Sequence, residues 1–405
     1  MRNFLSIILC LLATSAVGQK IALVNGHIIN GTDNTVYENH TLLVDGRLIT
    51  NLQPSSSSIP QEYEQIDLSG RYIMPGMIDA HTHISSLASA ERALESGVTT
   101  VRSASVSAYQ DITIREMVKA GQLPGPDMIA AGVFVTPQLG ETVLADPRLG
   151  VLSEGVQTEE ELRTLVRINI DRGVDVIKTR GTERAGLPYT DPRRQTYTQE
   201  QLAVVVDEAA KANVPVMVHA HGDEGAYAAV AAGALSIEHG TYLSRKTLEL
   251  MRAKGTYLVP TYTTVVDLVE PGGDYDNPIL MMRGKHMLPA LAESFQMALE
   301  LGVKIATGAD TGYGSNSVTR VSMEAENFVL MGMTPFQAIQ AATVIGAELL
   351  ELDAQTGRLA AGYEADLIIL TGNPLDDIRY LQDVVMVMSN GQVAMKRFPF
   401  EIEEE

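Results

Sequence analysis

The sequence predicts an α/β protein, a (β/α)8 TIM-like barrel with a small β-sandwich domain built from both chain ends. Two observations predict this fold. Eight short apolar segments alternate with amphipathic helical stretches over roughly 285 residues, which is the count and span of such a barrel. Short strand-like segments separated by turns such as Asn-Gly and Asp-Gly occur near both ends of the chain, where they could complete one small sheet or sandwich.

The order of these segments predicts three parts. Residues 1–18 read as a signal peptide, residues 19–70 together with 355–400 as the composite β-sandwich, and residues 71–354 as a catalytic barrel.

The barrel strands are expected at short apolar runs, with helices between most of them. A doubly wound open sheet is the rival fold, but no Gly-x-Gly-x-x-Gly opens a helix and no Walker-type loop occurs. The predicted strands are 73–80, 98–101, 128–135, 174–177, 214–218, 235–237, 257–259 and 303–306, and the clearest helices are 158–172, 198–211 and 244–254.

Composition excludes several classes of function. The chain has 405 residues and a formal net charge of -20, which argues against nucleic acid or an anionic membrane surface as a partner. Tryptophan is absent and aromatic residues make up 5%, so a surface that stacks on bases or sugars is not expected. The expected partner is a small-molecule substrate, and a homo-oligomer is left open.

The first residues have the anatomy of a cleavable secretory signal. Arg2 gives a positive start, residues 4–13 are mostly apolar, and Ala16 and Gly18 supply small residues for cleavage. The alternative is a frayed N-terminal strand. We expect export to the periplasm or beyond, with no membrane insertion after cleavage. Cys10 lies inside this segment, so a mature chain would have no cysteine for disulfides, metal binding or nucleophilic attack.

Histidines, a lysine and an aspartate follow the predicted strands in an order that indicates a metal centre. Histidines spaced i, i+2 on a strand share one face, so a pair of this kind can reach one ion. Imidazole and carboxylate suit zinc and similar divalent ions. The residues are His81, His83, Lys178, His219, His221, His239 and Asp310.

Each of these residues also has a structural interpretation. Lys178 could form an ion pair at the barrel mouth, and His221 could be a hydrogen-bonded structural imidazole. Asp310, which precedes Thr-Gly, could cap a helix. Glu238 is expected on the opposite side of its strand from the neighbouring histidine, packed in an ion pair.

The run Met-Pro-Gly-Met-Ile-Asp-Ala-His-Thr-His at 74–83 resembles the first-strand signature of the amidohydrolase superfamily. Similar matches occur at 174–178, 218–222, 236–240 and 307–312, so the resemblance covers nearly the whole mature chain. Among its branches the chain looks most like the imidazolonepropionase-like group, which includes bacterial Xaa-Pro and Xaa-Arg/Lys dipeptidases.

The resemblance implies two divalent metal ions, expected to be zinc. It assigns one ion to His81, His83 and Asp310 and the second to His219 and His239. Lys178 would be carboxylated by CO₂ and lie between them as a carbamate.

The implied activity is hydrolysis of an amide or peptide C–N bond, most simply in a dipeptide or an N-acyl amino acid, with Asp310 moving the proton. Alternatives are a cyclic amide, a lactone or another non-peptide ester or amide. A mononuclear deaminase-like enzyme is disfavoured, because those relatives carry glutamate where this chain has Gly222. A silent binding protein is disfavoured because no ligand is missing. Residues 136–140 lack a histidine that some prolidases have there, which leaves proline specificity open.

Arg180 is the best sequence candidate for holding a substrate carboxylate. It lies two residues beyond Lys178, so it would share the inward face of the same strand. The alternative is an ion pair with Glu183. Further candidates for substrate contact are His221, Tyr227, Arg102 and Arg184.

Overall fold

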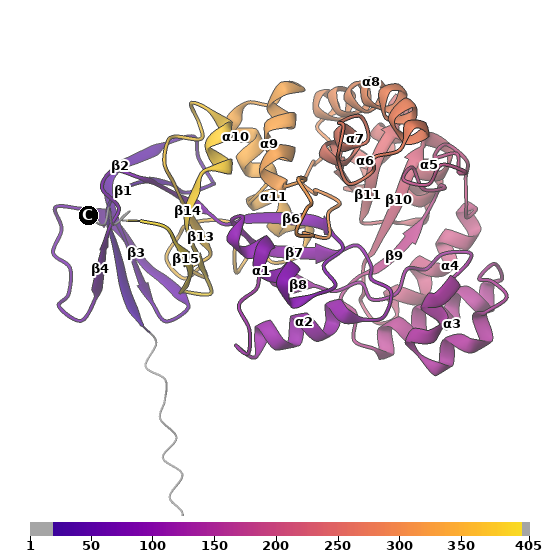
Figure 1. Ribbon diagram of the computed structural model, residues 1–405, viewed down its shortest axis with the longest axis horizontal. Coiled ribbons are helices and arrows are strands. Elements are labelled where there is room, and N and C mark those ends of the chain that lie inside the picture. Colours follow the sequence, from indigo (N-terminus) through magenta and orange to yellow (C-terminus); the bar gives the residue numbers. More distant parts are fainter. Residues whose placement is uncertain (1–18, 399–405) are drawn as a thin grey trace, which may run out of the picture.

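The computed structural model describes residues 19–398. The signal peptide predicted for residues 1–18 lies outside the described residues. Strands from both ends of this range lie together at one end of an elongated molecule, and the helices gather toward the other end (Figure 1). No helix in residues 19–398 is long and apolar enough to cross a membrane.

The end strands form one hydrogen-bonded sheet of eight strands, in the order β15-β14-β13-β5-β1-β2-β3, with β4 pairing to β1. β5 pairs with β1 along one edge and with β13 along the other, so strands from both chain ends share one sheet. The strands are β1 (Lys20–Ile29), β2 (Val36–Asp45), β3 (Leu48–Pro54), β4 (Glu64–Asp67), β5 (Tyr72–Pro75), β13 (Leu367–Leu370), β14 (Val384–Ser389) and β15 (Gln392–Lys396).

The middle of the chain supplies parallel strands in a three-stranded and a four-stranded sheet. Backbone hydrogen bonds link the two sheets from Val135 to Lys178, at 2.8 Å. The segment 303–311 then runs between β12 and β6, bonding to both, so that the strands follow one another in a circuit. The strands are β6 (Met77–Thr82), β7 (Val98–Ser103), β8 (Asp127–Ile129), β9 (Ile177–Arg180), β10 (Val216–Gly222), β11 (Ser236–Tyr242) and β12 (Tyr257–Val259).

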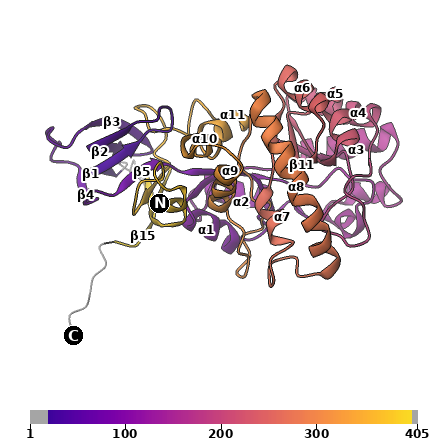
Figure 2. The same ribbon diagram turned by 90° about the horizontal axis from the view of Figure 1, so that it is seen from above.

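Helices connect and cover these parallel strands (Figure 2). The predicted helices at 158–172, 198–211 and 244–254 are confirmed as α3, α4 and α6, each started by a threonine or serine N-cap. The helices are α1 (Leu87–Glu95), α2 (Gln110–Lys119), η1 (Gly140–Ala145), η2 (Pro147–Leu152), α3 (Glu159–Asp171), α4 (Gln199–Ala210), α5 (Asp223–Ala232), α6 (Arg245–Lys254), α7 (Tyr262–Asp267), α8 (Pro278–Leu301), α9 (Val321–Leu330), α10 (Pro335–Ala341), α11 (Val344–Leu349) and η3 (Ile378–Gln382).

The buried carboxylate of Glu208 in α4 connects this helix to α3. Glu208 accepts hydrogen bonds from Arg167, Lys211 and Arg163 at 2.7, 2.7 and 2.8 Å. Burial would raise the pKa of Glu208, but these three cations outweigh it and lower the pKa to about 2.

Several predicted strands have different limits in the structure. The strand predicted at 73–80 is two strands, β5 and β6, interrupted at Gly76, where an added Cβ would lie 2.2 Å from a side-chain oxygen of Thr99. The strand predicted at 128–135 is regular only in β8, and the one at 303–306 is reduced to a single bridge at Ile305. β9 begins at Ile177, so Lys178 lies inside the strand and Arg180 ends it.

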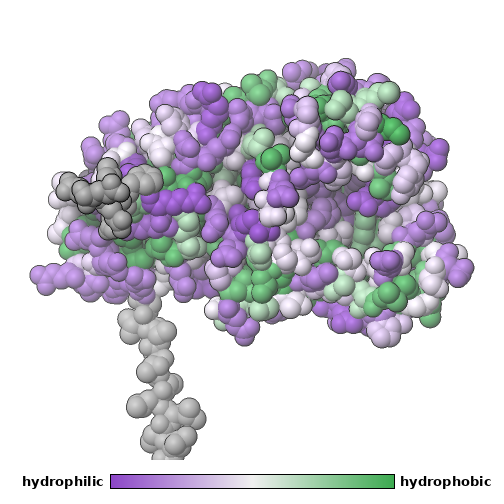
Figure 3. All heavy atoms as spheres, in the orientation of Figure 1, coloured by the Kyte–Doolittle hydropathy of each residue, from purple (hydrophilic) through white to green (hydrophobic). Residues whose placement is uncertain are grey.

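On the face shown in Figure 3 hydrophilic side chains predominate, and apolar side chains form scattered patches between them.

Candidate metal centre

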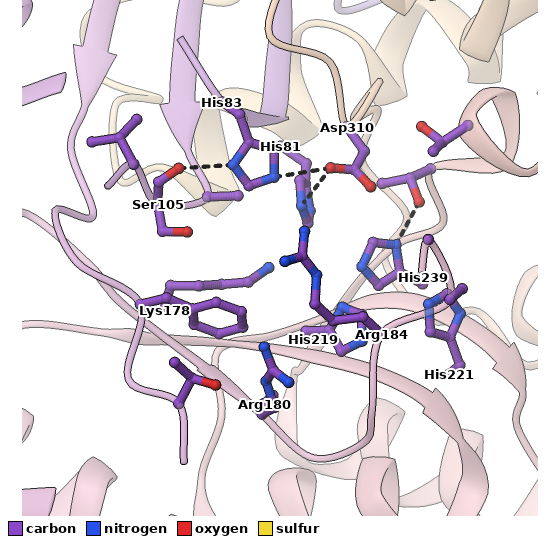
Figure 4. Close-up of a pocket in the computed structure, with 18 of the residues that line it drawn as sticks. His81, His83, Ser105, Lys178, Arg180, Arg184, His219, His221, His239 and Asp310 are labelled. Carbon is purple, nitrogen blue, oxygen red and sulfur yellow. Dashed lines mark hydrogen bonds and ion pairs between the residues drawn. The ribbon is translucent and has the colours of Figure 1, made fainter. Parts of the chain in front are cut away.

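A cavity of about 350 Å³ opens where the parallel strands end. Figure 4 shows the titratable residues on its wall. Every residue that the sequence predicted as a ligand lines this cavity, as do His221, Arg180 and Arg184. The predicted ligands are His81, His83, Lys178, His219, His239 and Asp310.

The first group joins β6 to the segment after β12. Nε2 of His81 lies 3.3 Å from Asp310 Oδ1, and Nε2 of His83 lies 3.0 Å from the same oxygen. His83 donates from Nδ1 to the Ser105 carbonyl at 2.7 Å, which fixes the orientation of its ring. The i, i+2 spacing therefore brings both imidazoles to one carboxylate, as the sequence predicted.

His81 is oriented by a buried ion pair. Its Nδ1 donates to Glu238 at 2.6 Å, and the other Glu238 oxygen accepts from Arg102 at 2.9 Å. Burial would raise the pKa of Glu238, but Arg102 and His81 lower it to about 2. The ion pair predicted for Glu238 is confirmed, but its placement opposite to His239 is wrong. His239 has a φ of 75°, which breaks the alternation of the strand, so both side chains turn inward.

The second group contains His219, His221 and His239, whose nitrogen ligand atoms lie within 4.8 Å of one another. His219 donates from Nε2 to the Glu183 carbonyl at 3.0 Å, and His239 Nδ1 hydrogen-bonds with the Thr261 hydroxyl at 2.7 Å. Burial holds the pKa of His219 and His239 well below the usual range. Neutral imidazoles of this kind are suited to metal binding.

His221 belongs to the same group, so its position would also allow it to bind a metal ion. Its Nδ1 hydrogen-bonds with Thr241 at 2.8 Å, and its ring stacks on that of His239 at 4.5 Å between centroids. Burial lowers the pKa of His221 to about 3.

Lys178 extends toward the space between the two groups (Figure 4). Its side chain is 2% exposed, and within residues 19–398 its amine has no hydrogen-bond partner. Burial lowers the pKa of Lys178 to about 8, so about a tenth of the amine is neutral at pH 7. The ion pair considered for this lysine is therefore not formed.

Of the residues predicted to contact the substrate, Arg180 lines the cavity and Tyr227 does not. Arg180 lines the cavity with its guanidinium 4.7 Å from the centre of the Phe134 ring, and the Glu183 carboxylate pairs with Arg194 instead. Tyr227 does not belong to the cavity, because it lies one turn into α5 with its ring beneath Lys246 of α6, at 4.4 Å.

The prediction that Arg102 contacts the substrate is also wrong. Arg102 is 1% exposed and donates to Ala80, Ser236 and Glu238, so it is part of the interior and does not face a substrate.

Sequence reasoning missed Tyr275, which lines the cavity from the loop between α7 and α8. The negative charge of Asp310, and then burial, raise the pKa of Tyr275. No periodic pattern or motif marks this loop residue. Thr136 and Gln138 also line the cavity, at the place where a histidine was found to be missing.

The donor atoms fit a divalent cation. Glu238 and the Ser105 carbonyl accept hydrogen bonds, so the Nδ1 atoms of His81 and His83 carry the protons and their Nε2 lone pairs face Asp310. Three acceptors that converge in this way are satisfied by a cation bound among them.

Comparison with known proteins identifies the family. The profile of the amidohydrolase family matches residues 72–394. The chain belongs to the amidohydrolase family. This amidohydrolase is 29% identical over 410 residues to ochratoxinase from Aspergillus niger, covering 90% of this chain and 84% of that protein. It is 27% identical over 387 residues to imidazolonepropionase from Paracoccus denitrificans, covering 82% and 88%.

A solved Xaa-Pro dipeptidase with bound methionine superimposes on the amidohydrolase with a TM-score of 0.82 and 29% identity, covering 93% of this chain and 99% of that one. The imidazolonepropionase-like branch predicted from the sequence is confirmed. These relatives support a hydrolase that acts on C–N bonds of small molecules. They also imply a TIM barrel with an attached β domain, which agrees with the circuit of parallel strands.

Proposed function

We propose that this amidohydrolase is a binuclear metal-dependent enzyme that cleaves the amide bond of an N-acyl amino acid or dipeptide with a free carboxylate. The single observation that carries the proposal is Arg180, a guanidinium in the wall of the cavity that holds both histidine groups. The circuit of parallel strands is interpreted as a (β/α)8 barrel, with the site at the carboxyl ends of its strands.

The two groups of ligands would each hold a divalent ion, expected to be zinc. His81, His83 and Asp310 would bind one ion, and His219 and His239 the other. When bound, such ions polarise a carbonyl and lower the pKa of water toward neutrality.

Lys178 is expected to carry a carbamate. Its neutral amine would attack CO₂, forming one N–C bond and losing one proton, and the product carboxylate could reach both groups. A buried amine without a partner and with a lowered pKa supports this step. A cationic lysine at this position would instead repel metal ions.

Asp310 would move the proton. In the hydrolysis, water adds to the amide carbon, the C–N bond breaks, and the departing nitrogen must gain a proton. Among the described residues that line the cavity, Asp310 is the sole carboxylate, so it is the group that can accept the water proton and pass it on.

Arg180 would orient the substrate. Its Nε has no hydrogen-bond partner within the described residues, and the ring of Phe134 covers its guanidinium face. Burial lowers the pKa of Arg180 to about 10, which shows how costly this charge is without an anion. A substrate carboxylate would satisfy it with two parallel hydrogen bonds.

The test is a set of N-acyl amino acids and dipeptides, each as the free acid and as the C-terminal amide, assayed with the zinc-reconstituted protein. Arg180→Met should raise KM at least tenfold for the free acids and leave the amides unchanged, and Arg245→Met on the surface is the control. Lys178→Ala should lose activity, and short carboxylic acids should restore part of it. Absence of hydrolysis of every amide by the wild type, at two bound metals per chain, would refute the function.

Export is also proposed, on the basis of the segment 1–18 alone. Mass spectrometry of the native protein should place its first residue near Gln19, and an intact Met1 on the purified protein would contradict export.

A further inference from the structure

A second arginine reaches the cavity from the loop that leaves β9. Arg184 lies four residues after Arg180 and lines the same wall. Within residues 19–398 no carboxylate forms an ion pair with either guanidinium. The neighbouring acid Glu183 pairs with Arg194 instead, at 3.2 Å. Figure 4 shows the two guanidinium groups at separate places on the wall.

The backbone on both sides of Arg184 is held by hydrogen bonds. The Glu183 carbonyl accepts from His219, and the Arg184 carbonyl accepts from the hydroxyl of Thr190. The next carbonyl, of Ala185, accepts from Arg283 of α8. Three successive carbonyls are thus fixed, so the position of Arg184 is built into the fold even though its side chain is exposed.

Arg283 also holds the rest of this loop. Its guanidinium donates to the carbonyls of Leu187, Pro188 and Thr190 in addition to that of Ala185. One side chain therefore determines the course of the loop over several residues.

Close backbone contacts fix the loop further at its start. A Cβ added to Gly181 would lie 2.5 Å from the carbonyl oxygen of Gly225 in α5, and a Cβ on Gly225 would lie 2.3 Å from that of Gly181. On the cavity side, a Cβ on Gly186 would lie 3.0 Å from the ring of Tyr275. The loop has little freedom to carry Arg184 away from the cavity.

The charges at this end of the cavity are unbalanced. Arg180 and Arg184 both line this cavity, and within residues 19–398 neither guanidinium is paired with a carboxylate. Asp310, the carboxylate among the described lining residues, belongs to the first metal-binding group with His81 and His83. Two guanidinium groups without a paired carboxylate favour a ligand that brings two negative charges.

We propose that Arg180 and Arg184 form a subsite for two carboxylates of one leaving amino acid, so that amides of aspartate and glutamate are preferred over those of asparagine and glutamine. The proposal rests on the proposed function, with Arg180 taking the α-carboxylate and Arg184 the side-chain carboxylate. A single carboxylate shared by both arginines would not explain their separate positions.

The test is isothermal titration of the metal-loaded protein with the product amino acids L-glutamate and L-glutamine. Glutamate should bind at least tenfold more tightly to the wild type. Arg184→Gln should abolish this difference, whereas Arg180→Gln should weaken the binding of both ligands. Arg193→Gln is the matched control, because Arg193 belongs to the same loop but pairs with Asp191 at 3.1 Å on the surface.

Measurements of hydrolysis distinguish failure of the proposed subsite from failure of the proposed amide hydrolysis. The ratio of kcat/KM for N-acetylglutamate over N-acetylglutamine should fall by at least tenfold in Arg184→Gln. Equal binding of both ligands by the wild type, a preference that survives in Arg184→Gln, or a preference for an acidic acyl group instead would overturn the subsite while leaving amide hydrolysis intact. Tight glutamate binding without hydrolysis of any amide would retain the subsite and reject the proposed function.

Discussion

Removing Arg102 should strongly destabilise the fold. The guanidinium is 1% exposed, and it donates to the Ala80 carbonyl at 2.8 Å, to Ser236 at 3.1 Å and to Glu238 at 2.9 Å. Arg102→Met would leave Glu238, which is 0% exposed, with a buried charge and without its cation. Loss of one partner from a buried pair costs about 3–5 kcal/mol, so we expect a loss in this range from the free energy of unfolding.

The assay is urea unfolding of the metal-free protein followed by far-UV circular dichroism, because the chain has no tryptophan. Arg245→Met is the matched control, since Arg245 pairs with Glu300 at 3.2 Å with side chains 49% and 64% exposed, and its loss should cost less than about 1 kcal/mol. Replacing Glu238 by Gln in the Arg102→Met background should recover part of the loss. If Arg102→Met costs no more than the control, the pair does not stabilise the interior and the reasoning is wrong.

Three further predictions follow from contacts described above. Thr261→Ala removes the hydroxyl that orients His239 and should weaken zinc binding about tenfold in a competition titration, while Thr261→Ser retains it. Glu208 has a pKa near 2 in the folded protein against 4.5 ordinarily, so its charged form stabilises the fold fully above pH 4.5 and less as the pH falls toward 2. Glu208→Gln should therefore lower the urea midpoint at pH 7, and a difference of the same size at pH 2 would contradict this. Gly76→Ala should cost about 1–3 kcal/mol of unfolding free energy by overpacking, whereas Gly150→Ala, with no atom within 4 Å of the added Cβ, should be neutral.

The metal ligands could be predicted because strand periodicity determines where they lie. His81 and His83 share a strand face, and the carboxyl ends of parallel strands meet, so residues distant in sequence were expected in one place. Lys178 was expected at the end of its strand and lies inside it, with the same inward direction. One residue of error at a strand limit does not change the face.

Other parts of the site depend on contacts that no local pattern records. The positive φ of His239 turns its ring inward beside Glu238, although strict alternation would place the two side chains on opposite faces of the strand. Arg184 and Tyr275 lie on loops whose course is determined by distant partners such as Arg283. Tyr227 failed as a candidate because an α-helix has 3.6 residues per turn, and the position of Tyr227 in α5 directs its ring toward α6.

The division of β5 from β6 by a single glycine has a consequence for how the enzyme is made. β5 pairs with β1 on one edge and with β13 on the other, and β13 leaves the ribosome only after every strand of the circuit. One edge of β5 therefore stays open throughout most of translation, which is the condition under which strands mispair between nascent chains. We expect His81 and His83, which lie at the end of the next strand β6, to reach their final positions only once β13 has docked, so that acquisition of metal would mark a late stage of folding.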